Sequence, residues 1–243
     1  MKKIYVILAL LLVTPFISRA TNLSRFTSQA NQFFNKWVVN GDIDYASLKN
    51  KFVEIESLYQ DINTMNLNGA APGEKKSFYI NAYNLAVIYQ VTKYYPLKSP
   101  LDQSGFFDKV KHTIAGKSMT LNYLEILVLM KKFNDPRIHF AIACASRSCP
   151  DLASYAFKSD GLDANLDMRT ERVVNNPEYV AINTSDQSVR LTKIFKWYEN
   201  DFLSNASSVI GYLNKYRKEK IPEHYALTYM DYDWKLNEQQ VSR

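Results

Sequence analysis

The chain has 243 residues, of which 47% are hydrophobic and 22% charged, so it can bury a substantial core and is not composed like a disordered segment. Three of its 30 basic residues lie in the first 20 positions, which leaves 27 basic beside 24 acidic residues in the remainder. This slight excess gives no reason to expect nucleic acid or an anionic membrane as a partner.

The first 20 residues have the organisation of a cleavable signal peptide. Two lysines precede an unbroken apolar run over 4–13, and Ser18 and Ala20 are the small residues that a signal peptidase recognises. The run is shorter than a membrane span, and Pro15 argues against the alternative of an uncleaved N-terminal anchor. We therefore expect residues 1–20 to be removed and residues 21–243 to be exported to the periplasm or the extracellular space, with no membrane span left.

Helical periodicity dominates the rest of the chain. Turn and stop signals such as Pro72-Gly73 and Asp135-Pro136 separate the helical segments from one another. In chain order, helices are predicted over 23–39, 45–62, 75–94, 123–133, 161–173, 193–202 and 206–216, and a further one is expected to begin at Pro150.

Strand signals are fewer. A continuous apolar run over 137–144 predicts a buried central strand that is covered on both faces. Two segments joined by a five-residue loop, 179–182 and 188–191, predict a β-hairpin, and short extended segments are expected over 111–114 and 226–230. The sequence has no regular βαβ alternation, which favours an α+β fold, and no linker or repeat, which favours one domain over 21–243. We expect it to be mostly helical, with a small, mainly antiparallel sheet on which helices pack.

Both cysteines and a histidine lie within eleven residues, in and directly after this predicted strand. Histidine titrates closest to neutral pH, and a thiol becomes a useful nucleophile when a base or a helix N-terminus lowers its pKa. Because Pro150 favours a helix start, Cys149 is expected at a helix N-cap, where the dipole stabilises a thiolate. This places Cys149 ahead of Cys144 as a candidate nucleophile, with His139 as the base.

Less reactive alternatives fit the same residues. In an exported protein, Cys144 and Cys149 can form a structural disulfide that closes a short loop, or remain as inert buried thiols. His139 can equally be a core histidine with satisfied hydrogen bonds. The spacing matches no recognised zinc pattern, so we expect no metal site, and no cofactor is indicated.

Two acidic residues are candidates for a third catalytic member. Glu125 lies on the preceding predicted helix and can orient His139, although Asn122-x-x-Glu125 also fits a helix capping pattern. Asp201, on the helix after the hairpin, is the lesser candidate.

Three further polar side chains are candidates for a pocket or for structural bonds. Asn81 and Asn84 lie on one face of an apolar helix, where buried amides must tie down a loop or line a pocket, and the structural tie is favoured. Arg147 lies between the two cysteines. Together with His139 and the thiols, it favours a pocket for a small molecule or a peptide.

Five ordered motifs resemble the domain-of-unknown-function 547 family, which occurs in bacteria, plants and animals. The likeness covers about residues 40–237. In it, His139, Cys144, Cys149 and Pro150 match the family's His-x₄-Cys-x₄-Cys-Pro segment, and Asn81 and Asn84 match its paired asparagines. The resemblance implies no established reaction, but some animal members join a similar domain to a glutaredoxin-like one, which associates the family with thiol chemistry. The motifs are Gly41-Asp-Ile-Asp44-Tyr45, Phe78-Tyr-Ile-Asn81-Ala-Tyr83-Asn84, the segment 135–150, Lys193-Ile-Phe195-Lys-Trp197-Tyr198 and Tyr232-Asp233-Trp234-Lys-Leu236-Asn237.

Two classes of function therefore remain open. The first is a cysteine-dependent acyl-transfer enzyme, either a hydrolase or a transferase, with a Cys/His site. The second is a non-catalytic exported binding or scaffold domain, in which a disulfide between Cys144 and Cys149 holds the loop after the central strand.

Overall fold

The computed structural model describes residues 14–240, with side chains described from Asn22 onward. Most of the predicted signal peptide, including its apolar run over 4–13, lies outside the described residues. In the part that is described, no helix is sufficiently long and apolar to cross a membrane.

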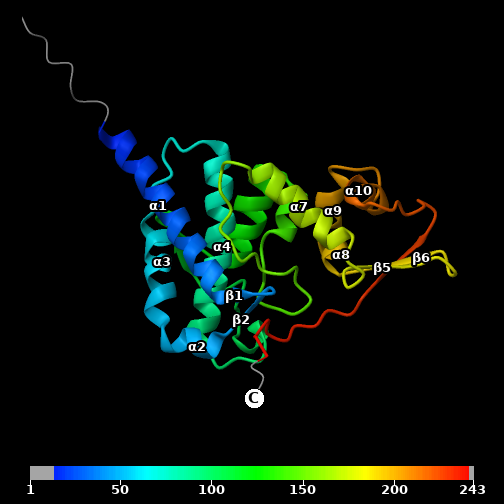
Figure 1. Cartoon of the computed structure of the whole chain (residues 1–243), viewed down its shortest axis with the longest axis horizontal. Coiled ribbons are helices and arrows are strands. Elements are labelled where there is room, and N and C mark those ends of the chain that lie inside the picture. Colours follow the sequence, from blue (N-terminus) through cyan, green and yellow to red (C-terminus); the bar gives the residue numbers. More distant parts are fainter. Residues whose placement is uncertain (1–13, 241–243) are drawn as a thin grey trace, which may run out of the picture.

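Four helices form the N-terminal half of the molecule, and Figure 1 shows α1, α3 and α4 packed side by side. The fourth helix is the central one. It buries most of its length because apolar residues occupy all of its faces, and it contacts the other three. The predicted helices over 23–39 and 75–94 are confirmed, whereas the predicted helix over 45–62 is divided in two at Lys51. The helices are α1 (Thr14–Trp37), α2 (Tyr45–Asn50), α3 (Phe52–Thr64) and α4 (Pro72–Tyr94).

Two small hairpins and an irregular helix cover the ends of this bundle. Both hairpins are antiparallel: β1 (Val38–Val39) with β2 (Asp42–Ile43), and β3 (His112–Ile114) with β4 (Lys117–Met119). A 3₁₀ turn, η1 (Pro100–Asp102), lies before the second hairpin. The predicted helix over 123–133 is a continuous helical segment with a π-helical centre, the kind of irregularity that often occurs at functional sites. Its parts are α5 (Leu121–Tyr123), η2 (Leu124–Met130) and α6 (Lys131–Phe133).

The prediction of a buried central strand over 137–144 is wrong. This segment begins as a 3₁₀ helix, η3 (Pro136–Phe140), because the Asp135 side chain accepts the Arg137 amide at its start. The chain then runs on as a buried loop. Within residues 14–240, no strand pairs with the segment 137–144. Instead, the buried Asn84 side chain of α4 donates to the Ala141 carbonyl and accepts the Ala143 amide, both at 2.9 Å.

The prediction of a helix beginning at Pro150 is also wrong. The chain from Pro150 continues without helix until α7 (Leu162–Val174). Asn81 holds this long loop by donating to the Phe157 carbonyl at 2.7 Å and accepting the Phe157 amide at 2.9 Å.

The C-terminal half has its own apolar core and one three-stranded sheet. The predicted hairpin is confirmed as β5 (Val180–Asn183) antiparallel to β6 (Ser188–Leu191), and β7 (Ala226–Tyr229) lies parallel to β6. The predicted helix over 193–202 is divided into two short helices. The helices of this half are α7, α8 (Ile194–Trp197), α9 (Glu199–Leu203) and α10 (Val209–Tyr216). The described residues thus form a mostly helical α+β structure with small, mainly antiparallel sheets, as predicted.

The segment after β7 returns across the molecule to the N-terminal hairpin, as Figure 1 shows. Main-chain hydrogen bonds fix its course: Asn237 donates to Ala145 and accepts from Ile43, and Leu236 donates to Lys98. This return segment, residues 230–240, therefore covers the loop that carries both cysteines.

Candidate functional site

A cavity of about 210 Å³ lies beside the cysteine loop, between the two halves of the chain. Its walls come from α4, the π-helical segment, η3 with the following loop, α8 and the return segment. The residues that line it are Tyr83, Phe107, Asn122, Glu125, His139, Ile142, Cys144, Cys149, Ile194, Trp197, Tyr198, Tyr232 and Trp234.

Both cysteines reach this cavity as free thiols. The structural disulfide, predicted as one alternative, is therefore not formed. Cys144 is half-buried, and its Sγ lies 3.0 Å from Ser146 Oγ and 3.2 Å from the Tyr232 hydroxyl. Cys149 is buried, and its Sγ accepts the Cys144 amide at 3.0 Å.

The Cys144 thiol is the more acidic of the two. A hydrogen bond from the Cys149 thiol, together with the Ser146 and Tyr232 hydroxyls, stabilises the Cys144 thiolate. These donors lower the pKa of Cys144 to about 7 against the opposing effect of burial. Donation of that hydrogen bond, with burial, raises the pKa of Cys149 well above its usual range. The Cys144 amide acts on Cys149 in the opposite direction but is the smaller effect.

This order reverses the one expected from the sequence. Cys149 was placed first because a helix was expected to begin at Pro150 and to stabilise a Cys149 thiolate. That helix is absent, so the physical reason for preferring Cys149 is lost. The next residue after Cys144, Ala145, is buried and has a left-handed conformation with φ of 61°, an uncommon conformation for a residue other than glycine that occurs more often at functional sites. Cys144 is therefore the candidate nucleophile.

His139 is held by Asp201 rather than by Glu125. Its Nε2 lies 2.8 Å from Asp201 Oδ2 at the start of α9, and its ring is stacked on Tyr198 with a centroid distance of 4.0 Å. Because a carboxylate can only accept, the neutral imidazole carries its proton on Nε2, and Nδ1 is left as the basic nitrogen. Asp201 thus has the orienting role that the sequence had assigned first to Glu125.

Glu125 instead binds two phenols. Its carboxylate accepts from the Tyr83 hydroxyl at 2.9 Å and from the Tyr198 hydroxyl at 2.5 Å. Burial and the negative charge of Glu125 raise the pKa of both tyrosines well above their usual range. Because Tyr198 also stacks on His139, it connects the carboxylate to the imidazole without direct contact between them.

Asn122 does not cap the helix in the way its spacing from Glu125 suggested. The capping group is Thr120, whose hydroxyl accepts the Tyr123 amide at 3.1 Å. The Asn122 side chain lines the cavity instead, and it makes no hydrogen bond within the part of the chain that the structure describes.

The other predicted polar residues lie outside the cavity wall. The side chains of Asn81 and Asn84 form hydrogen bonds with the loops described above. Arg147 is exposed on the opposite side of the cysteine loop, where it lines a second cavity of about 500 Å³ with Asp42 and Asp151 among others. Arg147 therefore does not line the cavity that holds His139 and Cys144, whereas Cys149 borders both cavities.

The aromatic residues of the cavity wall were not predicted as site residues from the sequence. Neither the pair Trp197 and Tyr198 nor the return segment has a predicted role. Their only signal was membership of the last two motifs of the family resemblance. Within the described residues, no group of three or more His, Cys, Asp or Glu is arranged to hold a metal ion.

Residues 67–174 match the model of a family described as "Protein of unknown function, DUF547". Over these residues the chain is similar to that family. The resemblance predicted from the five motifs is confirmed over these residues. No curated protein and no solved structure matches the chain significantly. The matched range includes His139, both cysteines and Glu125, whereas Asp201 and the return segment lie outside it.

Proposed function

We propose that the cavity is the active site of a cysteine-dependent acyl-transfer enzyme, with Cys144 as the nucleophile. The observation that carries the proposal is the environment of Cys144. Its thiol is free, half-buried in the cavity wall and surrounded by hydrogen-bond donors that lower its pKa to about 7. About half of such a thiol is ionised at neutral pH, and the thiolate is the nucleophilic form.

His139 has the properties of a general base and acid in this reaction. Its orientation by Asp201 leaves Nδ1 as the acceptor, and Asp201 stabilises the imidazolium that forms when His139 takes a proton. The free amide of Asn122 is the donor that we assign to the developing oxyanion.

The proposed reaction proceeds in two steps. His139 takes the Cys144 proton, and the thiolate attacks the acyl carbon, forming a carbon–sulfur bond as the carbonyl electron pair moves to oxygen. When that pair returns, the bond to the leaving group breaks, and the leaving group takes the proton from His139. Water or another acceptor then attacks the thioester and gives its proton to His139. The carbon–sulfur bond breaks, and the leaving Cys144 thiolate takes the proton back from His139.

The test is detection of an acyl-enzyme by intact-mass spectrometry after incubation with a panel of activated esters and thioesters. We expect acylation of the native protein and of Cys149→Ser, and none of Cys144→Ser, which is the matched variant. Asp201→Asn should lower the acylation rate about 10²-fold or more and change its pH profile, because the orientation of the base is lost. Equal labelling of Cys144→Ser and the native protein, or no acylation by any member of the panel, would remove the proposal.

We also propose that the protein is exported after cleavage behind Ala20. The support is the order of charged, apolar and small residues in positions 1–20. The non-catalytic alternative is an exported binding domain that uses the same cavity without acyl transfer.

A further inference from the structure

The wall of the thiol cavity is aromatic to an unusual degree for so small a volume. Six of its thirteen lining residues are aromatic, one is a carboxylate, and none is a lysine or an arginine. The six are Tyr83, Phe107, Trp197, Tyr198, Tyr232 and Trp234.

Three of these rings form one cluster in the cavity wall. The ring centroids of Trp197 and Trp234 each lie 4.7 Å from the ring centroid of Tyr232. The centroids of the two indoles lie 5.9 Å apart. Trp197 is 46% exposed, so a ligand can reach this cluster from solvent. The face of an aromatic ring carries partial negative charge, and indole is the side chain that attracts cations most strongly.

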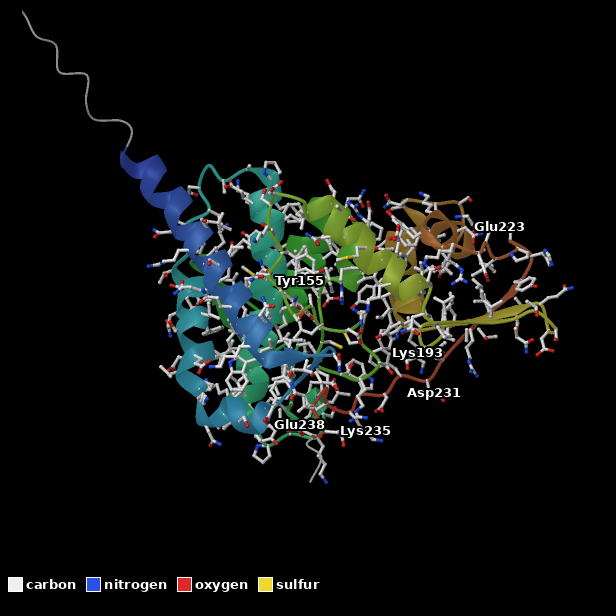
Figure 2. All side chains as sticks on the ribbon, in the orientation of Figure 1. Tyr155, Lys193, Glu223, Asp231, Lys235 and Glu238 are labelled. Atoms are coloured by element: carbon white, nitrogen blue, oxygen red, sulfur yellow. The ribbon has the colours of Figure 1, made fainter. Side chains whose placement is uncertain are left out.

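The electrostatics of the wall favour a positive ligand. The Glu125 carboxylate is buried, and both of its oxygens accept phenol hydrogens. The lysine at the start of α8, Lys193, does not line the cavity. It lies 3.8 Å from Asp231, and both residues are labelled in Figure 2. In a site of low polarity an anionic group would be repelled by Glu125, whereas a cation would be attracted.

The volume sets the size of the ligand. A cavity of about 150 Å³ is known to accept benzene, so the 210 Å³ found here suits a compact group such as trimethylammonium with a short chain attached. The hydroxyl of Tyr232, one ring of this cluster, lies 3.2 Å from Cys144 Sγ, so a ligand bound at the cluster lies close to the thiol.

We propose that this aromatic cavity binds the quaternary or protonated ammonium group of a small ligand. Resting on the function proposed above, we further assign a cationic substrate to the enzyme. This substrate is an acyl ester of an amino alcohol, an acyl thioester of an amino thiol, or an acyl amide of a diamine. The binding of the cation itself does not depend on catalysis.

The binding test uses tryptophan fluorescence in a Trp37→Phe, Cys144→Ser background. Trp37 lies on α1, where its indole nitrogen donates to Glu54 at 2.9 Å, so its removal leaves only the two indoles of the cavity as reporters. Choline is titrated against 3,3-dimethylbutan-1-ol, which has the same shape without the charge. We expect choline to bind at least about tenfold more tightly than the alcohol, which corresponds to a difference of about 1.4 kcal/mol in binding free energy.

Two variants test the source of this preference. Glu125→Gln should reduce it to about threefold or less, because the carboxylate is removed while its size is kept. Trp197→Leu changes an exposed residue and should weaken choline binding severalfold without loss of the fold, so it keeps the test valid if Glu125→Gln unfolds. Equal binding of the two compounds, or tighter binding of the alcohol, would overturn the cation site.

A second measurement separates this proposal from the proposed function. Acylation of the native protein by a choline ester is compared with acylation by the matched 3,3-dimethylbutyl ester. Choline binding without acylation by either ester overturns the acyl-transfer function and leaves the cation site. Acylation at equal rates overturns the cation site and leaves the function. Faster acylation by the choline ester, by about tenfold or more, supports both.

Discussion

Removal of the Tyr232 hydroxyl should make Cys144 a weaker acid. The phenol lies 3.2 Å from Cys144 Sγ and is one of the hydroxyl donors that hold the pKa of this thiol at about 7. We expect Tyr232→Phe to raise that pKa by about one unit, equivalent to about 1.4 kcal/mol of lost thiolate stabilisation. The Ser146 hydroxyl, 3.0 Å from both the sulfur and the phenol, remains and limits the effect. The double variant with Ser146→Ala should move the pKa further towards that of an ordinary thiol, and the two effects should not be additive.

The assay is the rate of iodoacetamide alkylation as a function of pH, with the modified residue identified by peptide mass spectrometry. A rise of one unit lowers the thiolate fraction at pH 7 from about one half to about one tenth, so the rate at that pH should fall about fivefold. The rate at high pH should be unchanged, because the fully ionised thiol is the same nucleophile in both proteins.

Tyr155→Phe is the matched control for this experiment. The Tyr155 hydroxyl is buried and has no hydrogen-bond partner in the described part of the chain, and the residue is labelled in Figure 2. Its removal should leave the alkylation midpoint where it is in the native protein. If Tyr232→Phe gives the same midpoint as Tyr155→Phe, or a lower one, the assignment of the Cys144 pKa to these hydroxyl donors is refuted.

Three further predictions concern stability and processing. Burial and the charge of Lys93 lower the pKa of His112 from 6.5 to about 4, so the unfolded chain binds a proton more readily than the folded chain. Acidification from pH 6.5 to 4 should therefore lower the free energy of unfolding by about 3 kcal/mol. Urea titrations at several pH values test this, and the loss should be smaller in His112→Gln; equal pH dependence of the two proteins contradicts it. Gly41→Ala should lower the free energy of unfolding by about 1–3 kcal/mol, because φ is +88° and a Cβ would lie 2.8 Å from Asp151 Cβ. Gly116→Ala, which also has positive φ but nothing within 4 Å of a Cβ, should cost less in the same thermal melts, and the reverse order contradicts the steric argument. Mass spectrometry of the exported protein should find Thr21 as its first residue, and an intact N-terminus on the exported chain would contradict cleavage after Ala20.

The elements that sequence patterns predicted correctly are those whose determinants are local. The long helix over 75–94 appears as α4 because Pro72 and a continuous apolar surface define it within its own segment. The hairpin of β5 and β6 follows from two short strands and a turn that are adjacent in sequence. Periodicity, caps and turns act over a few residues, so they can be recognised without knowledge of the rest of the fold.

The conformation of the apolar segment after Pro136 depends on a contact that is distant in sequence. Its burial was predicted correctly, but its conformation was not, because an apolar run indicates burial without indicating which groups bond its backbone. Asn84, 57 residues earlier in the chain, supplies the bonds that a neighbouring strand would otherwise provide. The predicted helix at Pro150 failed for a related reason, since Asn81 satisfies the backbone of that loop from a distance of 76 residues in sequence.

The candidate site divides in the same way. The sequence by itself identified His139 and the two thiols, because a histidine and two cysteines close together in an apolar segment are recognisable from their chemistry alone. Only the tertiary structure decided how these groups are paired. It brings Asp201 to His139 across 62 residues and Tyr232 to Cys144 across 88. Those contacts set the order of the two thiol pKa values and the composition of the cavity wall. They depend on the course of the return segment over the cysteine loop, which is determined by packing between parts of the chain that no local pattern connects.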